Sequence, residues 1–464
     1  MTNSSSVSGI ILAAGKGTRM KSNLPKCAHL ICDLPMAEHV GRAMKQADAR
    51  KPVIIAGYQS EILESSLSED YFFAYQSEQL GTGHATLMAK DVLEGKYKTI
   101  FIAPGDAPLL TAEVFTELLK YHKSSGADLT LATCILKDPT GYGRIIRNTK
   151  GYPSNIIEQK DATSEVLSID EVCTGVYCVE SEMLWHYLPK LKNQNAQNEY
   201  YLTDLVQLID GNGGKVESVC FRNADFFMGV NDRWQLSQAS QVMCQRILKK
   251  HALNGVTLLD PSSIQIGADV EIGIDTCIAP MTILSGKTRI GEKCQLGPFS
   301  MIKDSIIEEG CEILMSQVQK AVLRKGSRCG PFANLRPHVE LGKNAKVGNF
   351  VEVKNSLLGE KVSVAHLSYI GDAIIGLNTN IGAGTITCNY DGFAKHQTEI
   401  GANVFVGSNS TLVAPLSVGD GAIIGAGSVI TQNVSPDALG LGRAKQENKE
   451  EWAKKWRYRK QMSK

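Results

Sequence analysis

Residues 264–302 read IQIGADVEIGIDTCIAPMTILSGKTRIGEKCQLGPFSMI, and an aliphatic residue returns at every sixth position of this stretch. The repeated positions are Ile266, Ile272, Ile278, Leu284, Ile290, Leu296 and Ile302. A period of six does not match the α-helix, whose apolar residues recur every 3.6 positions, and it lasts too long for a hairpin. It is typical of a parallel β-helix, in which each aliphatic side chain points into a narrow prism and stacked coils share one core.

The same period continues toward the end of the chain. It returns at Leu323, Leu335, Leu341, Val347 and Val353, and then at Ile400, Val406, Leu412, Val418, Ile424 and Ile430. The spacing slips by one residue between Ile370 and Ile375, and residues 388–397 interrupt it, so we expect that stretch to loop outward. We therefore predict a β-helix domain over residues 253–464.

This domain ends in a tail over residues 444–464, where Trp452 and Trp456 stand among many lysines and arginines. A short amphipathic helix is the simpler interpretation of the tail. The alternative is a cationic arm that reaches a phosphate-bearing ligand.

Residues 1–230 follow a different pattern. Short apolar runs at 10–14, 52–56, 99–103 and 129–135 alternate with helical patterns at 37–47, 82–93 and 112–122. Such alternation predicts an α/β fold with a mainly parallel sheet covered on both faces. Ligands of these folds bind beyond the carboxyl ends of the strands, so the loops after Ala14 and Ala103 are the candidate sites.

The stretch 231–252 contains neither glycine nor proline and places apolar residues roughly on one stripe. The stripe consists of Leu236, Ala239, Val242, Ile247 and Leu248. We expect a helix that links the two domains.

The composition favours a cytoplasmic globular protein. The formal net charge of +1 gives no general attraction for nucleic acid or for an anionic membrane. No stretch approaches the ~20 apolar residues that span a bilayer, and the run at 10–14 is too short for a signal peptide. The 12 cysteines contain no CxxC pair, which is typical of reduced cytosolic thiols and gives structural zinc little support.

The first apolar run leads into LAAGKGTRM at residues 12–20, with Leu-Pro-Lys at 24–26. Gly15 and Gly17 let backbone N–H groups close around a phosphate chain. Arg19 and Lys26 can offset the negative charge of that chain during group transfer. A dinucleotide fingerprint would need a third glycine at Met20, and no Walker A loop is present.

With this glycine loop, the GTRM sequence and the Pro-Lys pair, the chain resembles the sugar-1-phosphate nucleotidyltransferases. Two later motifs, AHLSYIGD at 365–372 and NIGAGTITCNYDG at 380–392, narrow the resemblance. They are similar to the bifunctional bacterial N-acetylglucosamine-1-phosphate uridyltransferase/glucosamine-1-phosphate N-acetyltransferase family, over essentially the whole chain. The resemblance implies a Rossmann-like nucleotidyltransferase domain followed by a left-handed parallel β-helix of hexapeptide repeats.

In the first domain the resemblance implies that Arg19 and Lys26 are catalytic. It places nucleotide and sugar contacts on Leu12, Ala13, Ala14, Gly15, Lys26, Gln76, Gln79, Gly81, Thr82, Gly143, Glu158 and Asn231. Within this set, the residues from Gln76 to Thr82 would recognise uracil, and Gly143 and Glu158 would hold the acetamido sugar.

Asp106 follows the apolar run at 99–103, and the resemblance pairs it with Asn231 as a Mg²⁺ site. Oxygen ligands of this kind suit Mg²⁺, although a lone strand-end aspartate is more often a cap or turn residue. Two positions depart from the family pattern. Cys173 stands where the family usually has an asparagine that contacts the sugar, and Pro104 stands where an aromatic residue is common.

In the second domain the resemblance makes His366 the general base, and the pKa of histidine suits removal of a proton near neutrality. The implied contacts with the acetyl-accepting sugar phosphate are Arg336, Lys354, Tyr369, Asn380, Asn389 and Tyr390. The implied contacts with acetyl-coenzyme A are Ala383, Ser408, Ala426 and Arg443. The backbone N–H of Ala383 could support the oxyanion of acyl transfer.

We therefore expect acetylation of glucosamine 1-phosphate by acetyl-CoA, followed by uridylyl transfer from UTP with Mg²⁺. The product would be UDP-N-acetylglucosamine, a precursor of bacterial peptidoglycan and lipopolysaccharide, and hence of the cell wall and cell shape. By analogy, the β-helix would form a homotrimer with acetyl-transfer sites between subunits.

Three alternatives remain open. The protein could be a monofunctional nucleotidyltransferase with a structural β-helix. It could be a metal-dependent hydratase whose zinc is held by His338, His366 and His396, although these histidines have no recurring ligand-like spacing. It could also be a purely structural repeat protein, against which the GTRM and NYDG motifs argue.

Overall fold

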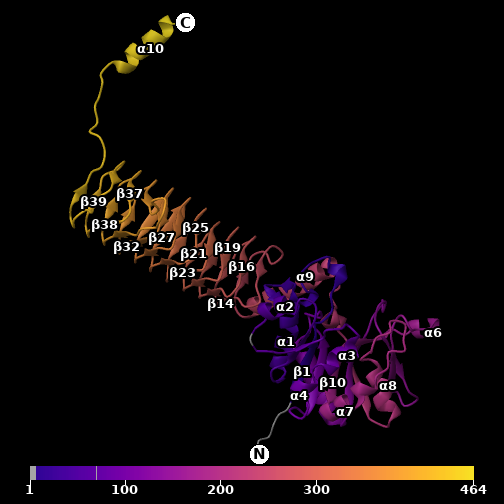
Figure 1. The fold of residues 1–464 in the computed structure, drawn as a ribbon. Helices are drawn as coiled ribbons and strands as arrows, with labels where there is room; N and C mark the ends of the chain where they lie inside the picture. The colour runs from indigo at the N-terminus through magenta and orange to yellow at the C-terminus, as the bar shows by residue number, and fades with distance from the viewer. Residues whose placement is uncertain (1–6, 69, 464) are drawn as a thin grey trace, which may run out of the picture. The chain divides into compact units, whose positions relative to one another are not determined.

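The computed structural model describes residues 7–68 and 70–463, which divide into two units, Met1–Arg246 and Ile247–Lys464 (Figure 1). The division lies within residues 231–252, where the sequence predicts a helix, and α9 (Arg233–Leu253) occupies that stretch. The expected role of this helix as a linker stays a prediction. None of the described helices is both long enough and apolar enough to cross a bilayer.

The first unit is built on a sheet with the strand order β11-β7-β10-β6-β1-β4-β5. These strands are β1 (Val7–Leu12), β4 (Val53–Ala56), β5 (Phe72–Tyr75), β6 (Thr99–Pro104), β7 (Leu129–Ile135), β10 (Glu171–Glu180) and β11 (Val216–Phe221). Only β10 on this path runs antiparallel to its neighbours, so the prediction of a mainly parallel sheet is confirmed. The hairpin of β8 (Arg144–Arg147) and β9 (Pro153–Ile157) pairs with β10.

Helices cover both faces of this sheet. The helices are α1 (Met36–Gln46), α2 (Ser60–Ser66), α3 (Thr82–Leu87), α4 (Lys90–Leu93), α5 (Ala112–Ser125), α6 (Ser164–Leu167), α7 (Ser181–Tyr187) and α8 (Asp204–Gly211). Helices α1 and α5 pack into one hydrophobic cluster, and α3, α4, α7 and α8 pack into another. Short 3-10 segments lie at Thr18–Met20, Lys26–Ala28, Leu188–Lys190 and Ala224–Phe227, and β2 (Leu30–Ile31) pairs with β3 (Leu34–Pro35).

Two boundaries in this unit differ from the sequence prediction. The strand expected at 10–14 is β1, which begins and ends earlier, so Ala13 and Ala14 lie in the loop. The single helix expected over 82–93 is divided into α3 and α4. There Met88 and Ala89 bond to carbonyls three residues back, and this tighter pattern interrupts the α-helical one.

The second unit is a parallel β-helix with three faces, and the prediction of this fold is confirmed (Figure 1). Its first face contains β12 (Thr257–Leu258), β15 (Cys277–Ile278), β18 (Gln295–Leu296), β21 (Glu312–Ile313), β24 (Arg328–Cys329), β27 (Lys346–Asn349), β30 (Ser363–His366), β33 (Asn380–Ile381), β36 (Phe405–Val406), β39 (Ile423–Ile424) and β41 (Leu439–Gly440). Its second face contains β13 (Gln265–Ile266), β16 (Ile283–Ser285), β19 (Met301–Lys303), β22 (Gln317–Gln319), β25 (Asn334–Leu335), β28 (Glu352–Lys354), β31 (Tyr369–Gly371), β34 (Ile386–Cys388), β37 (Thr411–Val413) and β40 (Val429–Ile430). Its third face contains β14 (Glu271–Ile272), β17 (Arg289–Ile290), β20 (Ile306–Ile307), β23 (Ala321–Leu323), β26 (Val339–Leu341), β29 (Leu357–Leu358), β32 (Ala373–Ile375), β35 (Thr398–Ile400) and β38 (Leu416–Val418).

The six-residue repeat forms the core of this unit. Every repeat position named from the sequence belongs to the continuous hydrophobic cluster, with Ile272 only partly buried at one end. Residues 388–397 do loop outward, since the Phe393 side chain is 98% exposed. The period predicted the core because each coil contributes one inward residue per face.

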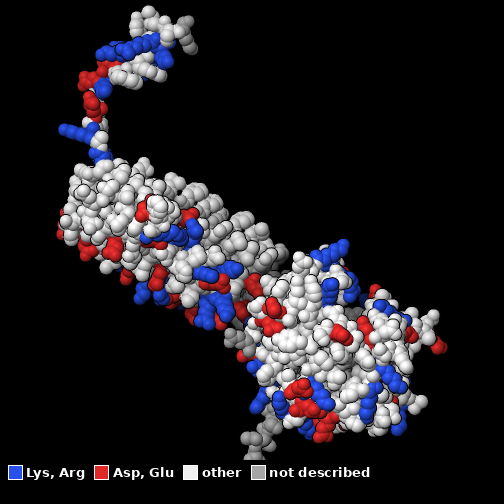
Figure 2. All heavy atoms as spheres, viewed as in Figure 1, with Lys and Arg blue, Asp and Glu red and all other residues white. Residues whose placement is uncertain are grey.

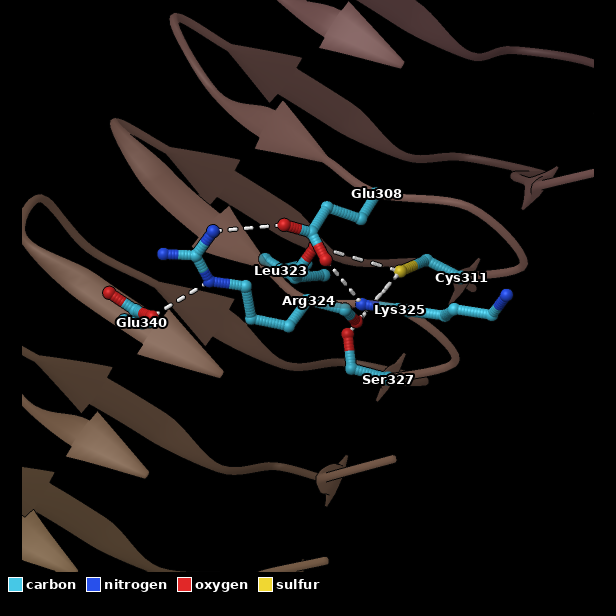
Figure 3. A network of polar contacts seen from close by, with 7 residues as sticks. All are labelled: Glu308, Cys311, Leu323, Arg324, Lys325, Ser327 and Glu340. Carbon is cyan, nitrogen blue, oxygen red and sulfur yellow. Dashed lines mark hydrogen bonds and ion pairs between the residues drawn. The ribbon is translucent and has the colours of Figure 1, made fainter. Parts of the chain in front are cut away.

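Ion pairs connect successive coils on the third face (Figure 3). The Arg324 guanidinium lies between Glu308 of the coil before and Glu340 of the coil after, with N–O distances of 2.9 and 2.8 Å. The buried Cys311 thiol donates to the Arg324 carbonyl at 3.2 Å. Figure 2 shows charged side chains gathered over the strands of this face. The third face therefore exposes ion-paired side chains, beside apolar residues such as Ile306 and Ile374.

The tail forms α10 (Trp452–Met462), in which the rings of Trp452 and Trp456 stack with centroids 6.4 Å apart. No described residue of α10 is buried. The short helix predicted for the tail is confirmed, and its role as a cationic arm stays a prediction.

Replacing Ile302 by alanine should lower the free energy of unfolding of the β-helix by about 2–5 kcal/mol, because Ile302 is 0% exposed and its loss leaves a cavity. Urea unfolding followed by circular dichroism measures the change. Lys303→Ala, on the exposed side of the same strand, is the matched control and should stay close to wild type. Equal destabilisation by both changes would contradict the assignment of the core.

Candidate functional sites

The glycine loop follows β1, and its backbone is held by neighbouring strands. Gly17 adopts a φ of +62°, and a Cβ there would lie 2.6 Å from Cβ of Lys26. A larger residue at this position would push the Lys26 stem away, so glycine lets the lysine pass close to the loop. The amide of Gln79 donates to the Ala14 carbonyl at 2.8 Å, which fixes the start of the loop.

Two cations and two oxygen-bearing side chains meet beyond the carboxyl ends of β1 and β6. The Lys26 ammonium forms an ion pair with Asp106 and lies 3.4 Å from Oδ1 of Asn231. The Arg19 guanidinium donates to the same Asn231 oxygen at 2.9 Å. The structure thus brings together four residues that are up to 212 positions apart in the sequence.

The Asp106–Asn231 pair fits a divalent cation by its donor chemistry. Both groups offer oxygen, the donor atom that Mg²⁺ prefers. In this structure the Lys26 ammonium approaches oxygens of both side chains, so the two oxygens already share one cation. Their positions are therefore compatible with a common metal ion, which the phosphates of a substrate would also contact.

A cavity of about 570 Å³ opens beside this cluster. The predicted residues Leu12, Arg19, Thr82, Asp106, Gly143, Glu158 and Asn231 line it. Its volume falls within the range that small-molecule sites usually have. Sugar and phosphate contacts predicted from the resemblance therefore face one space.

The residues predicted to recognise uracil lie before and at the start of α3. The buried Gln76 amide donates to the Gly81 carbonyl at 3.1 Å and contacts Nδ1 of His84 at 3.0 Å. Gly81 has a φ of +108° and packs against the Tyr200 backbone, where a Cβ would clash. The turn before α3 is therefore fixed by Gln76 and Gly81 together, with the Thr82 side chain beside the cavity.

Glu158 carries the carboxylate of the sugar end of the cavity. Burial raises the pKa of Glu158 above its ordinary value, with smaller contributions from Asp204 and Asp161. The Thr203 hydroxyl donates to Oε1 at 3.1 Å and opposes this rise. A Cβ at Gly143 would lie 2.8 Å from Cγ2 of Ile156, so only glycine fits at this position beside the carboxylate without a shift of Ile156.

The two departures from the family pattern both line the cavity. The Cys173 sulfur lies 3.3 Å from the Tyr177 hydroxyl, and burial raises the pKa of the thiol to about 11. Pro104 ends β6 and lies near Gly175, where a Cβ would be 3.6 Å from the proline ring. Cys173 is therefore a neutral thiol engaged with a tyrosine.

Several cavity residues were not singled out from the sequence: Thr140, Gly141, Tyr142, Thr174, Tyr177 and Thr203. Tyr177 reaches the cavity because β10 contains a bulge between Cys173 and Tyr177, where Gly175 has a φ of +76°. A glycine inside an apolar strand is the signal that could have predicted this bulge.

In the β-helix, the predicted sugar-phosphate residues stack along the second face. Arg336 follows β25 and pairs with Glu352 at 2.9 Å, and Lys354 ends β28 in register with Gly371 of β31. A Cβ at Gly371 would clash with the Tyr369 hydroxyl and the Asn389 amide, so both groups converge there. Four of the predicted residues therefore lie on successive coils.

The outward loop brings one further cation to this group. The Lys354 ammonium lowers the pKa of Lys395, which shows that the two like charges lie close together. Burial alone would raise the pKa of Asp372, but hydrogen bonds from Asn355 and Asn389 bring it below its ordinary value. Lys395 was not predicted, because its position depends on how residues 388–397 fold back. Neighbouring cations favour an anionic ligand.

His366 ends β30 on the first face, in register with Asn349 of the coil before. Its side chain is exposed, and Leu367 turns the chain with a φ of +49°. Asn380 lies in the next coil, where β33 pairs with β30. Tyr390 is also exposed, and its hydroxyl donates to the Gly392 carbonyl at 2.6 Å.

The predicted acetyl-CoA residues follow glycines on three successive coils. A Cβ at Gly382 would lie 2.5 Å from the Ser408 nitrogen, and one at Gly407 would lie 2.5 Å from the Ala426 nitrogen. Close stacking therefore aligns Ala383, Ser408 and Ala426 along one corner. The Arg443 side chain approaches Gly427 in the same region, where a Cβ would lie 3.9 Å from Cδ of the arginine.

The zinc hydratase alternative gains no support. Within residues 7–68 and 70–463 of one chain, no three side chains of the His, Cys, Asp or Glu type gather as a metal site. His396 instead pairs with Asp391 at 2.7 Å within the outward loop.

Comparisons with known proteins agree with both halves of this description. The nucleotidyl transferase family matches residues 8–234, and the hexapeptide repeat of succinyl-transferase matches residues 397–432. The bifunctional protein GlmU of Latilactobacillus sakei is 46% identical over 446 residues, which cover 96% of each chain. The bifunctional proteins GlmU of Carboxydothermus hydrogenoformans and Brevibacillus brevis are 46% and 44% identical, covering 96% and 97% of this chain and 100% and 98% of theirs.

Glu158→Gln should raise the midpoint of thermal unfolding at neutral pH. Because the folded pKa of Glu158 is raised, its favourable contribution exists below the ordinary carboxyl pKa and is lost as pH rises through the folded value. The difference from wild type should therefore vanish near pH 4. Calorimetry between pH 4 and pH 7 measures the difference in unfolding midpoint between the variant and wild type. Glu165→Gln, at an exposed position of α6, is the control. A constant difference at every pH would contradict the role of burial.

Proposed function

The chain belongs to the family of the bifunctional protein GlmU, and from that premise we propose that it makes UDP-N-acetylglucosamine in two steps. Residues 253–464 transfer an acetyl group from acetyl-CoA to glucosamine 1-phosphate. Residues 1–230 then transfer a uridylyl group from UTP to N-acetylglucosamine 1-phosphate, and residues 231–252 link the two domains. The observation that carries this proposal is the meeting of Arg19, Lys26, Asp106 and Asn231 at one edge of the sheet.

In the uridylyl step, a phosphate oxygen of the sugar attacks the α-phosphorus of UTP and pyrophosphate leaves. Arg19 and Lys26 hold the triphosphate and offset the charge that develops on it. Mg²⁺ held by Asp106 and Asn231 would neutralise further phosphate charge. Glu158 and Gly143 orient the acetamido sugar, so catalysis comes from alignment and electrostatics without a covalent enzyme intermediate.

In the acetyl step, the amine of glucosamine 1-phosphate attacks the thioester carbonyl of acetyl-CoA. His366 accepts the proton that the amine loses, and the thiolate of coenzyme A leaves. The cationic group of Arg336 and Lys354, with Tyr369, holds the sugar phosphate. Asn380, Asn389 and Tyr390 orient the sugar, while Ala383, Ser408, Ala426 and Arg443 bind acetyl-CoA.

We further propose that the chain acts as a homotrimer. A ridge of apolar side chains follows one corner of the β-helix, namely Met281, Phe299, Phe332, Phe350 and Leu367, each more than half exposed. The rings of Phe332 and Phe350 stack with centroids 5.1 Å apart. Isolated exposed apolar residues are common, but a continuous exposed column is typical of an interface.

The ridge also leads to the acetyl-transfer site, because its member Leu367 directly follows His366. A neighbouring copy that covers the ridge would therefore approach His366 as well. The charged third face, visible in Figure 2, would remain in solvent. This arrangement supports a trimer with acetyl-transfer sites between subunits.

A cytoplasmic location fits the substrates and the thiols of this chain. UTP and acetyl-CoA are intracellular metabolites, and buried thiols such as those of Cys27, Cys178 and Cys329 are typical of a reducing compartment. The product would serve the synthesis of bacterial peptidoglycan and lipopolysaccharide.

Two single variants should separate the two activities. His366→Ala should lower acetyl transfer by about 10²–10⁴-fold and leave uridylyl transfer intact, because only acetyl transfer needs this base. Arg19→Ala should lower uridylyl transfer by about 10²-fold or more and leave acetyl transfer intact. Chelation of divalent cations from the wild-type protein should likewise lower uridylyl transfer and leave acetyl transfer intact. Mass spectrometry of products formed with each cosubstrate omitted in turn measures both steps. Loss of both activities in either folded variant would refute the two-site assignment. Absence of acetyl transfer in the wild-type protein would instead favour the monofunctional alternative.

Phe332→Glu combined with Phe350→Glu should break the trimer into smaller species, because paired carboxylates at the ridge cannot be buried without large desolvation. Light scattering after gel filtration measures the mass. Acetyl transfer should fall with the mass while uridylyl transfer persists. Lys325→Ala on the charged third face is the control and should stay trimeric. A monomeric wild-type protein with full acetyl-transfer activity would exclude the proposal.

A further inference from the structure

Arg144, the first residue of β8, is a buried cation. Its side chain is among the largest that are fully buried, with the residue 2% exposed. The exposed Asp138 carboxylate interacts with its charge, but the Arg144 Nε has no hydrogen-bond partner among residues 7–68 and 70–463. By contrast, Arg147 at the end of the same strand is exposed and pairs with Glu171 through two nitrogens. Burying a charge is unfavourable, so Arg144 needs another explanation.

The guanidinium instead holds a backbone turn. Nη1 donates to the Tyr142 carbonyl, and Nη2 donates to Oε1 of Gln159 at 3.3 Å. The same Gln159 oxygen accepts the Gly141 N–H at 2.9 Å. Arg144 and Gln159 therefore form a clamp on the turn at residues 140–143, attached at both its carbonyl and its amide side. The planar guanidinium suits this task because it reaches two acceptors in a fixed geometry.

This turn forms a wall of the proposed sugar pocket. Thr140, Gly141, Tyr142 and Gly143 all line the 570 Å³ cavity, whereas Arg144 and Gln159 lie behind it. Gly141 has a φ of +90°, which glycine adopts without strain. Because glycine also reaches many other conformations, bonds from outside the turn are needed to keep its shape. Gly143 in turn sits beside the Glu158 carboxylate.

The wall also reaches the segment that carries Asn231. Tyr142 contacts the backbone of Gly229, two residues before Asn231, and both Tyr142 and Gly229 line the cavity. A shift of the turn would therefore move the cavity wall at residues 140–143 directly. It would move the segment that carries Asn231 only through the contact of Tyr142 with Gly229.

We propose that Arg144 is a positioning residue for sugar 1-phosphate recognition: with Gln159 it holds the turn at 140–143 in the shape that accepts the sugar. The proposal rests on the uridylyl-transfer function assigned to this unit. Arg144 does not touch the substrate, and it acts through the backbone of Gly141 and Tyr142.

Steady-state kinetics with purified full-length protein tests this role. Arg144→Met should raise KM for N-acetylglucosamine 1-phosphate about tenfold and change KM for UTP by less than about twofold. Arg144→Lys should recover only part of the loss, because an ammonium cannot reach both acceptors at once. Arg147→Met, on the same strand but ion-paired at the surface, is the matched control and should keep both KM values.

Gln159→Leu provides an independent test if Arg144→Met does not fold. It removes the shared acceptor outside the cavity and should raise KM for the sugar phosphate, again with KM for UTP nearly unchanged. Equal shifts in both KM values, or lowered thermal stability with both KM values unchanged, would overturn the proposal. Absence of uridylyl transfer in the wild-type protein would instead refute the underlying function, so the two failures are distinguishable.

Discussion

Parallel pairing of strands in register is the constraint on which both sites depend. In the first unit it places the carboxyl ends of β1 and β6 side by side, and the Gly105 N–H bonds directly to the Leu12 carbonyl at 2.9 Å. The loops that follow must therefore meet, which brings Lys26 to Asp106. In the second unit the same pairing repeats each position one coil later, so side chains at equivalent positions form columns. In the first unit the site is formed by residues that follow the strand ends. In the second unit it is formed by polar residues at positions of the columns that face outward.

The two proposed sites present positive charge by different means. In the first unit, two cations share the oxygens of one carboxylate and one amide, so the group remains net positive toward a triphosphate. Its members come from three connecting segments, and an incoming phosphate or metal can replace contacts within the group. In the β-helix, Arg336 and Lys354 are fixed by the stacking of coils, and only Lys395 comes from a loop. The first arrangement suits rearrangement during transfer, and the second suits rigid positioning of an acceptor.

The sequence predicted those structural features that depend on patterns of nearby residues. The period of six identified core residues such as Ile302 and Leu335, because each repeat position has one environment in every coil. The strand–helix alternation predicted the sheet and the loops that carry Arg19 and Asp106. It could not predict the break at Met88 and Ala89, where both residues favour helix and only the hydrogen-bond pattern changes. It also missed Tyr177, Lys395 and Arg144, whose positions depend on a bulge, an outward loop and a turn held by a distant glutamine.

Because Cys173 is a poor hydrogen-bonding group, we expect the turn at 140–143 to contribute more to sugar recognition. The thiol and the Tyr177 hydroxyl contact each other at 3.3 Å, and the buried thiol stays neutral because burial raises its pKa to about 11. A thiol is a weak hydrogen-bond donor, so Cys173 offers the sugar weaker hydrogen bonding than an amide side chain would. The Cys173 N–H is itself bound to the Gly143 carbonyl at 2.8 Å, which ties the β10 wall to the end of the turn. We propose that sugar recognition relies on Glu158 and on backbone groups of the turn, and backbone groups select a ligand only when they are held still. The buried guanidinium of Arg144 supplies that restraint from behind the wall.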